Sequence, residues 1–179
     1  MFIRTERLFL RPGWIEDAPE LARAIGDESI VRNLARVPWP YCMDHARQWL
    51  TTPKPDKLPS FLITLPEEGG RIIGVCGFHE EQGEPAIGYW IARSHQGQGF
   101  ATEANQAILK LAQAIGYRRV RADHFADNPA SGRVLRKVGF LPTGRTSKRP
   151  SLARGTTSLS VEYSAELGDG CSARMPVAA

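Results

Sequence analysis

The sequence predicts a mixed α/β protein with a single domain, in which helices flank a largely antiparallel central sheet. Three short apolar runs, bounded by Gly, Pro and charged residues, follow one another between residues 60 and 92, as antiparallel strands do. Two later stretches carry apolar residues at helical spacing, with a strand-like run between them. The length of 179 residues fits one domain that buries a sizeable core.

The first half of the chain is predicted to contain one strand, two helices and three further strands. Residues 4–12 alternate between polar and apolar side chains, as a strand does. Asp17 is a candidate N-cap for the first helix, and the second helix is predicted to begin at Asp44. The three further strands are residues 60–65, 71–78 and 86–92.

The second half is predicted to alternate between helix and strand. Apolar residues at helical spacing follow Glu103, and Gly116 ends that helix. Residues 118–126 form the next strand. The helix after it has Asn128 as its N-cap and Gly139 as its stop.

The domain is predicted to span residues 1–167. Its last strand is the alternating run 156–167. The small and polar residues of 168–179 predict a disordered tail. No internal repeat or low-complexity segment divides the chain further.

Composition and cysteine content predict a cytoplasmic protein without a metal site. The net charge of +4 and the pI of about 9.2 fit an anionic ligand, although many proteins reach such values by chance. Cys42, Cys76 and Cys171 are widely spaced and form no CxxC pair, which predicts reduced thiols and no metal. The charged N-terminus has no signal-peptide pattern, and no apolar run approaches membrane-spanning length.

The most informative stretch is RSHQGQGFATEA, residues 93–104, where a glycine-containing loop runs directly into a helix. Free N–H groups in a first helical turn attract anions, and Gly97 and Gly99 let the backbone approach a phosphate because they have no Cβ. A Walker A loop is excluded because no lysine follows before Lys110, and GxGxxG is excluded because Thr102 stands at its last glycine. A tight turn without a ligand is the alternative.

This loop and four other motifs resemble a known family. Residues 96–101, QGQGFA, match Q/R-x-x-G-x-G/A, the acetyl-CoA pyrophosphate loop of the GNAT superfamily of N-acetyltransferases. TERLFLRP, IGYW, ATEA and NPASGRVLRKVGF occur in the same order as in its Rim-type branch, which acetylates the N-termini of ribosomal proteins. The resemblance covers about residues 3–165 and implies an acetyltransferase with acetyl-CoA as co-substrate.

The resemblance also implies how the co-substrate is held and how the amine attacks its thioester directly. The pyrophosphate would bind to backbone N–H groups of the loop, and the pantetheine arm would pair with the preceding strand at Trp90 and Ile91. A bulge in that strand often leaves one N–H free for the carbonyl oxygen in this family. The implied cofactor-binding residues of the loop are Gln96, Gly97, Gln98, Gly99, Phe100, Ala101 and Thr102.

Asn128 and Ser131 match the family pattern N-x-x-S. The resemblance implies that both contact the cofactor and that Ser131 is the catalytic residue that protonates the leaving thiolate. An ordinary first-turn role for Ser131 stays open, with Tyr89 and Tyr163 as the next candidates because many relatives use a tyrosine. Glu103 matches the glutamate of ATEA, but the sequence gives it no specific role.

The general base is not identified from the sequence. Rim-type enzymes often carry a glutamate just before IGYW, where this chain has Ala86, and another in the region where residues 141–155 hold no carboxylate. A histidine has a suitable pKa for a base, and water is a further option. The candidates on or near strands that border the cleft are His79, Glu80, Glu81, Glu84 and His124.

The stretch 145–154 is basic, with Arg145, Lys148, Arg149 and Arg154 and no acid. If these side chains face the acceptor, like charge repels a polyamine and favours an acceptor with an acidic neighbour. The sequence therefore predicts that polyamines are poorer substrates than acidic N-terminal amines.

The leading functional prediction is an acetyl-CoA-dependent N-acetyltransferase that acts on a protein N-terminus or a small-molecule amine. A non-catalytic acetyl-CoA-binding sensor with the same fold is the alternative. A nucleic-acid-binding domain is disfavoured because the aromatic residues are not interleaved with a basic stripe. The predicted partner is an amine acceptor, without nucleic acid or membrane, and a homodimer is left open.

Overall fold

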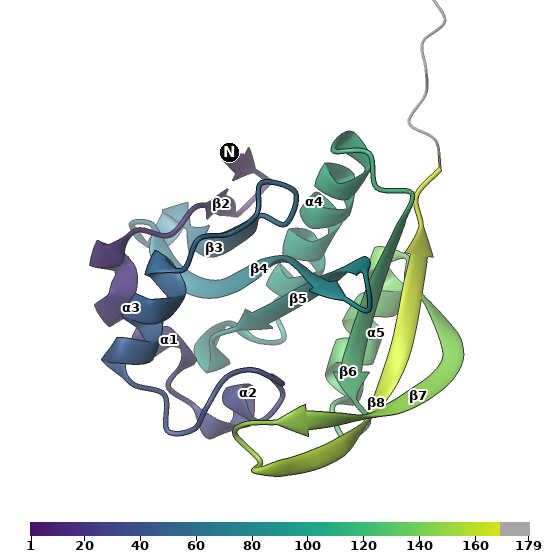
Figure 1. Cartoon of the computed structure of the whole chain (residues 1–179). Coiled ribbons are helices and arrows are strands. Elements are labelled where there is room, and N and C mark those ends of the chain that lie inside the picture. The colour runs from purple at the N-terminus through teal and green to yellow at the C-terminus, as the bar shows by residue number, and fades with distance from the viewer. Residues whose placement is uncertain (169–179) are drawn as a thin grey trace, which may run out of the picture.

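Within residues 1–168, eight strands form one sheet, and helices cover both of its faces (Figure 1). This computed structural model describes residues 1–168, so the predicted tail from residue 169 onward lies outside the described residues. The strands are β1 (Ile3–Arg4), β2 (Phe9–Arg11), β3 (Ser60–Leu65), β4 (Arg71–Glu81), β5 (Glu84–Ile91), β6 (Arg119–Phe125), β7 (Leu141–Ser151) and β8 (Thr156–Glu166). The helices are α1 (Ala18–Ile25), α2 (Glu28–Val31), α3 (Met43–Thr51), α4 (Phe100–Ala114) and α5 (Pro129–Val138).

The strand order in the sheet is β1-β2-β3-β4-β5-β6-β8-β7. Every neighbouring pair runs antiparallel except β5 and β6, which are parallel. A crossover through α4 joins these two strands, as a parallel pair requires. The mixed α/β domain with a largely antiparallel sheet is therefore confirmed.

The predicted first strand is in fact a hairpin. Residues 4–12 contain β1 and β2, separated by a turn in which the Thr5 N–H donates to the Leu8 carbonyl at 3.0 Å. The alternation of side chains continues through the turn, so the sequence pattern alone does not reveal it.

Two further elements were not predicted. The α2 helix has only four residues, which is too short to show helical periodicity. The β7 strand contains prolines and a glycine instead of alternating apolar residues, and it pairs with β8 through a register shift between Pro142 and Thr146. Its place depends on a partner strand and not on local propensity.

One predicted helix cap is confirmed and one is wrong. The Asn128 side chain accepts a hydrogen bond from the Ser131 N–H at 3.4 Å, as an N-cap does. Asp17 makes no such bond at the start of α1. Its carboxylate instead binds both terminal nitrogens of Arg11 at 2.7 Å and accepts the Trp14 N–H at 2.8 Å. Both carboxylate oxygens of Asp17 are therefore bound to Arg11, and the side chain does not cap α1.

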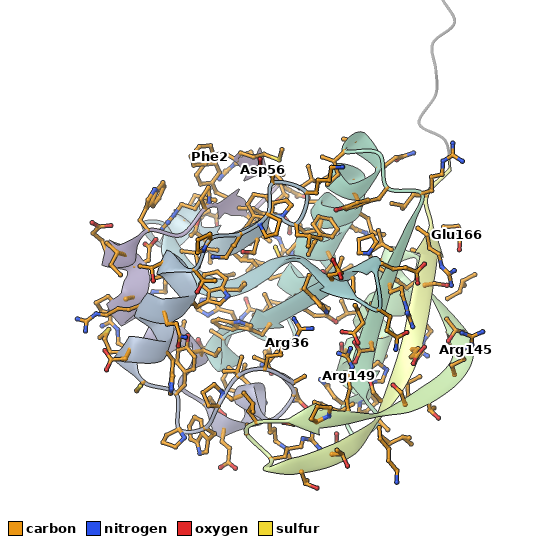
Figure 2. All side chains as sticks on the ribbon, in the orientation of Figure 1. Phe2, Arg36, Asp56, Arg145, Arg149 and Glu166 are labelled. Carbon is orange, nitrogen blue, oxygen red and sulfur yellow. The ribbon has the colours of Figure 1, made fainter. Side chains whose placement is uncertain are left out.

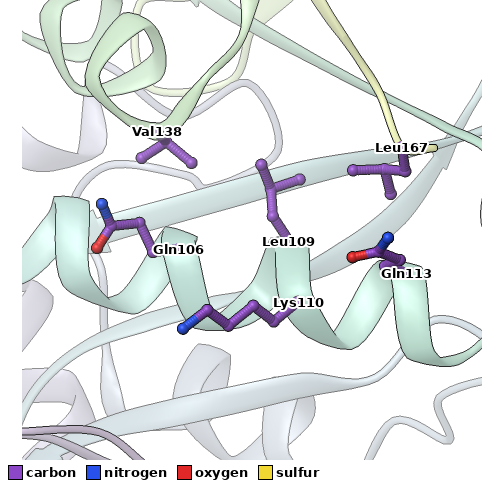
Figure 3. Close-up of a pocket in the computed structure, with 6 residues that line it drawn as sticks. All are labelled: Gln106, Leu109, Lys110, Gln113, Val138 and Leu167. Carbon is purple, nitrogen blue, oxygen red and sulfur yellow. The ribbon is translucent and has the colours of Figure 1, made fainter. Parts of the chain in front are cut away.

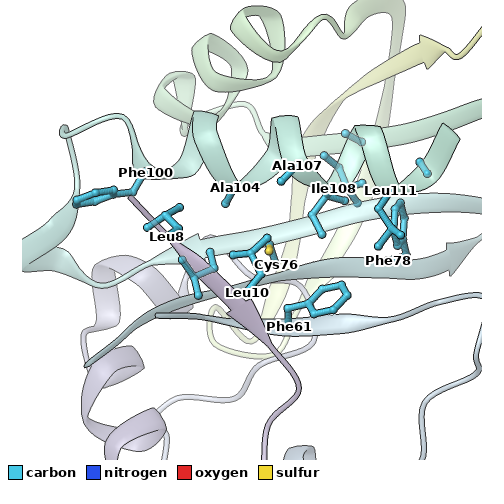
Figure 4. Packing of buried hydrophobic residues seen from close by; sticks show 14 of the residues in the cluster. Leu8, Leu10, Phe61, Cys76, Phe78, Phe100, Ala104, Ala107, Ile108 and Leu111 are labelled. Carbon is cyan, nitrogen blue, oxygen red and sulfur yellow. The ribbon is translucent and has the colours of Figure 1, made fainter. Parts of the chain in front are cut away.

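The main hydrophobic core fills the space between α4 and the sheet (Figure 4). The labelled core residues are Leu8, Leu10, Phe61, Cys76, Phe78, Phe100, Ala104, Ala107, Ile108 and Leu111. Those from α4 recur at three- and four-residue spacing, so the helix turns one apolar face to the sheet. Burial raises the pKa of the Cys76 thiol, which therefore stays protonated. A smaller cluster beneath α1 and α3 covers the opposite face.

The sheet opens between β5 and β6. Within residues 1–168 the two strands share one register pair, Ala86 with Arg121, near the start of each strand. On its other side β5 pairs with β4 along its whole length. Beyond Ala86 one edge of β5 therefore has no strand beside it. Figure 1 shows α5 behind β6, next to this opening.

Candidate active site

The glycine loop between β5 and α4 has the geometry that anion binding requires. Gly97 and Gly99 have φ angles of 78° and 86°, in the left-handed region that other residues rarely adopt. A Cβ on Gly97 would meet no atom within 4 Å, so the loop is open there. Gly99 is the N-cap of α4 and has no side chain that could bind the first-turn N–H groups. Those groups are thus available to a ligand.

Short-range contacts fix the loop against the end of β5. The Gln96 side-chain amide donates to the Ile91 carbonyl at 2.9 Å. The buried ring of His95 lies 2.9 Å from the Ser94 hydroxyl and 3.2 Å from a carboxylate oxygen of Glu68. Gln96, predicted to open the loop, therefore anchors it through its side chain.

Arg7 and Glu103 form a tether that the sequence did not predict. The backbone N–H and Nε of Arg7 each donate to a Glu103 carboxylate oxygen at 2.8 Å, and the Thr5 hydroxyl donates to the same carboxylate at 2.6 Å. Arg7 also donates to the Gln98 carbonyl at 3.0 Å, and its guanidinium lies 4.4 Å from the centre of the Phe100 ring. The hairpin between β1 and β2 therefore supports both the loop and the first turn of α4.

The tether explains the glutamate of ATEA. Burial alone would raise the pKa of Glu103, but hydrogen bonds from Thr5 and Arg7 and the charge of Arg7 bring this pKa below its usual value. The contact joins residues that lie 96 positions apart in the chain. TERLFLRP and ATEA were both recognised as motifs, which is the one signal that could have paired them.

β5 presents backbone to the opening, while the side chains of its last two residues are packed. Ile91 belongs to the core beneath α4. Trp90 packs on the opposite face, against the clusters that include Leu21 and Ile30. A ligand beside the free edge of β5 would therefore meet main chain and not side chains. Ile91 directs its backbone to this edge, whereas Trp90, paired with Val75, directs its backbone groups to β4.

The bulge expected in this strand is absent from its pairing with β4. The register runs without a shift from Glu81 opposite Glu84 to Gly74 opposite Ile91. The free edge arises because β6 diverges, so no bulge is needed to expose it. A register shift occurs instead in β3, between Ile63 and Thr64.

Ser131 and Tyr89 form a hydroxyl pair beside the free edge. The two hydroxyl oxygens are 2.8 Å apart, and the Tyr89 hydroxyl also lies 3.3 Å from the Ser131 carbonyl. Burial raises the pKa of Tyr89 to about 12, so the phenol keeps its proton at neutral pH. The structure thus brings the predicted proton donor together with the next candidate. Asn128 lies at the start of the same helix, where its side chain caps the Ser131 N–H.

The polar atoms of Tyr163 and His124 are engaged in hydrogen bonds. The Tyr163 hydroxyl is 3.2 Å from an Arg136 nitrogen and 3.4 Å from His124 Nε2. His124 Nδ1 lies 2.8 Å from the Phe125 carbonyl, so Nδ1 carries a proton and Nε2 is left to accept one. A Cβ on Gly132 would lie 2.6 Å from His124 Nε2, so only glycine allows α5 this close. Both rings are buried and pack in the protein interior.

The other face of β4 and β5 carries a charged cluster centred on Glu81. Arg149 approaches this carboxylate at 2.5 Å and Arg36 at 3.5 Å, and Figure 2 labels both arginines in this part of the molecule. Arg149 also pairs with Asp123 at 2.9 Å. Burial would raise the pKa of Glu81, but the hydrogen bond and charge of Arg149 bring it below its usual value.

The basic stretch 145–154 is therefore less basic than its composition predicts. Arg149 is neutralised by Glu81 and Asp123, and Arg154 binds both carboxylate oxygens of Asp127 at 2.9 Å. Only Arg145 and Lys148 of the four are exposed. The acids that pair with this stretch come from other strands and loops, which is why the local sequence did not reveal them.

Two cavities lie away from the glycine loop. A groove of about 370 Å³ runs between the later turns of α4 and the end of α5 (Figure 3), lined by Gln106, Leu109, Lys110, Gln113, Val138 and Leu167. A space of about 20 Å³ lies within the charged cluster, next to Glu81, Arg121 and Arg149. Beside the opening, the Tyr89 side chain reaches from β5 to Ser131 on α5.

A family model matches most of the chain. A profile described as "Acetyltransferase (GNAT) domain" matches residues 7–141. The chain belongs to the GNAT acetyltransferase family. It is accordingly an acetyltransferase of class EC 2.3.1.

Several curated GNAT proteins are similar in sequence. The chain is 29% identical over 147 residues to the N-acetyltransferase p20 of Bacillus licheniformis, covering 78% of this chain and 82% of that protein. It is 40% identical over 88 residues to the ribosomal-protein-serine acetyltransferase of Escherichia coli, covering 47% and 48% of the two chains.

Solved GNAT structures share the fold of this chain. An acetyltransferase of Bacillus anthracis superposes with a TM-score of 0.79 at 24% identity, covering 93% of this chain and 98% of that one. A ribosomal-protein N-acetyltransferase in complex with coenzyme A superposes with a TM-score of 0.77 at 21% identity, covering 95% and 100%. The Rim-type resemblance seen in the sequence therefore extends to known relatives and structures.

Two further properties concern the described part of the chain. No helix within residues 1–168 is long and apolar enough to span a membrane. In the same residues, no group of three or more His, Cys, Asp or Glu side chains gathers where it could hold a metal ion.

Proposed function

We propose that this GNAT protein transfers the acetyl group of acetyl-CoA to a primary amine, by direct attack of the amine on the thioester. The observation that carries the proposal is the free edge of β5, which leads from the glycine loop to the hydroxyl pair of Ser131 and Tyr89. One continuous surface thus offers a place for a phosphate, for an extended arm and for a leaving group.

The residues around this surface fit the co-substrate. Backbone N–H groups from Gly97 to Thr102 would bind the pyrophosphate, and the left-handed glycines keep the loop open to it. Arg7, whose charge is balanced by Glu103, holds the loop in place by donating to the Gln98 carbonyl. The main chain at the end of β5 would pair with the pantetheine arm, whose amides act like those of a strand; Ile91 offers its backbone to the free edge, and Trp90 lies next to it, bound to β4.

Ser131 is the proposed proton donor to the leaving sulfur. Its hydroxyl carries a proton at neutral pH, and the thiolate that forms beside it would take this proton. Because a serine alkoxide is a stronger base than a thiolate, the serine oxygen must regain a proton as it gives one up. Tyr89 lies 2.8 Å from this oxygen and can return a proton to it. This arrangement acts as a two-hydroxyl relay in general acid catalysis.

The proposed acceptor is a peptide N-terminus or a small-molecule amine. The similarity to a ribosomal-protein-serine acetyltransferase supports the first class. The similar fold of a coenzyme A complex supports the co-substrate.

Turnover tests the proposal. Acetyl-CoA is incubated with N-terminal peptides and small amines, and both free CoA and acetylated product are measured. We expect stoichiometric release of the two with at least one amine class. Thermal stabilisation by acetyl-CoA without turnover on any amine would favour the sensor instead.

A further inference from the structure

The strand β5 separates two sides of the proposed site. Side chains alternate along a strand, so Tyr89 points toward α5 and Gly88 toward the opposite face. Because Gly88 has no side chain, β5 contributes no side chain to that face at the residue next to Tyr89. Acyl transfer needs a proton acceptor where the amine arrives and a donor where the thiolate leaves.

The ring of His79 lies over Gly88. His79 lies on β4 opposite Ala86, and Gly77 lies opposite Gly88, so the imidazole reaches diagonally across to the glycine. Its Nδ1 is 3.5 Å from the position that a Cβ on Gly88 would take. About 29% of the side chain is exposed, which leaves room for an acceptor to reach it.

The surroundings of His79 prepare one ring nitrogen to accept a proton. Glu81, on the same strand, has a carboxylate oxygen 4.0 Å from Nε2, and its negative charge favours the tautomer with the proton on Nε2. Nδ1 is then the unprotonated nitrogen, and it is the ring nitrogen that lies next to Gly88. A nitrogen able to accept a proton therefore lies over β5, beside the residue that precedes Tyr89.

Charged groups from four elements face this ring. They are Arg36 after α2, Glu81 on β4, Asp123 on β6 and Arg149 on β7. Burial lowers the pKa of His79, the two arginines lower it further, and the two carboxylates oppose them, so the net pKa lies below the usual value of about 6.5. His79 is consequently neutral at pH 7 and able to accept a proton.

The other candidate bases are committed elsewhere. Glu81 binds two arginines, and Glu84 lies 3.4 Å from Arg121. His124 is buried against Tyr163. Glu80 is exposed close to the turn between β4 and β5.

We propose that His79 is the general base, accepting at Nδ1 the proton that the acceptor amine loses; the assignment rests on the proposed function. The amine nitrogen forms a bond to the acetyl carbon as the carbon–sulfur bond breaks and its electron pair goes to sulfur. One nitrogen proton goes to His79, and the Ser131 hydroxyl supplies the proton that sulfur takes up. The products are an amide and free CoA thiol.

Two acceptors with different needs for a base provide the test. The α-amine of a seryl peptide amide has a pKa of about 7.7–8.0 and is largely protonated at pH 7. An aromatic amine such as p-anisidine is already unprotonated there, and the ammonium that it forms on attack loses its proton readily to water. Wild type, His79→Gln and the control His45→Gln are compared with both amines between pH 6 and pH 9.5. His45 lies on α3 and is bound to Cys42.

For His79→Gln with the peptide, we expect kcat/KM at pH 7 to fall about 10²–10⁴-fold, the usual range for a general base. The loss in kcat/KM should become smaller as the pH rises above the pKa of the peptide α-amine. The aromatic amine should lose less than tenfold, and calorimetry should give an unchanged Kd for acetyl-CoA. His45→Gln should match wild type throughout.

Equal losses for both amines at every pH would indicate a structural role, and an unchanged pH profile would indicate no role; either overturns the assignment. Wild type without turnover on the whole amine panel would instead defeat the proposed function, and the assignment with it. The two failures are therefore distinct.

Discussion

The two ends of the site rest on different interactions. At the loop end, main-chain geometry dominates: glycines in the left-handed region, a side-chain amide on the end of β5, and the tether between Arg7 and Glu103. At the other end, which we propose receives the amine and call the acceptor end, charged side chains from separate elements neutralise one another around Glu81. The loop end therefore depends on backbone conformation, and the acceptor end depends on charge and pH.

The strongest test of this contrast is Gly99→Val, which forces a β-branched residue into a left-handed backbone at a strain of about 1–2 kcal/mol. We expect acetyl-CoA affinity to fall about 100-fold, equivalent to about 2.8 kcal/mol. Calorimetry on the folded variant gives the value. Gly116→Val, at the other end of α4 with φ of 90°, imposes similar strain and should leave affinity unchanged. Wild-type affinity in Gly99→Val would remove the loop from the cofactor site.

Ser131→Ala should reduce kcat about 10²–10⁴-fold, the range for a general acid, while the Kd for acetyl-CoA changes little. Tyr89→Phe keeps the ring and removes the second hydroxyl, so a smaller loss is expected. Steady-state kinetics and calorimetry separate the two effects. If Ser131→Ala turns over normally and Tyr89→Phe does not, the tyrosine is the donor.

Glu103→Gln should lower stability by about 1–2 kcal/mol, at the low end for bonds to charged groups because Arg7 is partly exposed. This corresponds to a Tm lower by about 2–8 °C at pH 7. The folded pKa of Glu103 is depressed, so its contribution is present above the unfolded value of about 4.3 and is lost as pH falls through the folded pKa.

The difference in Tm between wild type and Glu103→Gln should therefore narrow below about pH 4. Asp44→Asn is the matched control, because Asp44 lies in the first turn of α3 and its side chain is 85% exposed. A Tm gap that stays constant between pH 7 and pH 3 would argue against the carboxylate as its cause.

The smallest effect concerns the exposed charges of β7. Replacing Arg145 and Lys148 by serine should change kcat/KM for spermidine or for an acidic N-terminal peptide by about fivefold or less, because exposed charges contribute at most about 1 kcal/mol. Moderate salt should abolish the change. We therefore expect kcat/KM to be only slightly lower for polyamines than for acidic N-terminal amines, in the order that the sequence predicts. Spermidine preferred at every salt concentration would contradict it.

Apart from the tether, the loop end was predictable because its determinants are adjacent in the chain. Gly97, Gly99 and the apolar face of α4 lie within one continuous stretch, and the Asn128 cap is three residues from its partner. The acceptor end was not predictable, because Arg149 meets Glu81 only through the pairing of β7, a strand without local propensity. The tether from Arg7 to Glu103 was hidden for the same reason of distance in sequence.

The single register pair between β5 and β6 makes the sheet two half-sheets joined at one point. A ligand that lay along the free edge of β5 would contact both half-sheets and occupy the place of a strand between them. Occupancy would then stiffen both halves together, and amide exchange would slow on β6 as well as on β5. The co-substrate would thus be a temporary part of the architecture, present only while the enzyme is loaded.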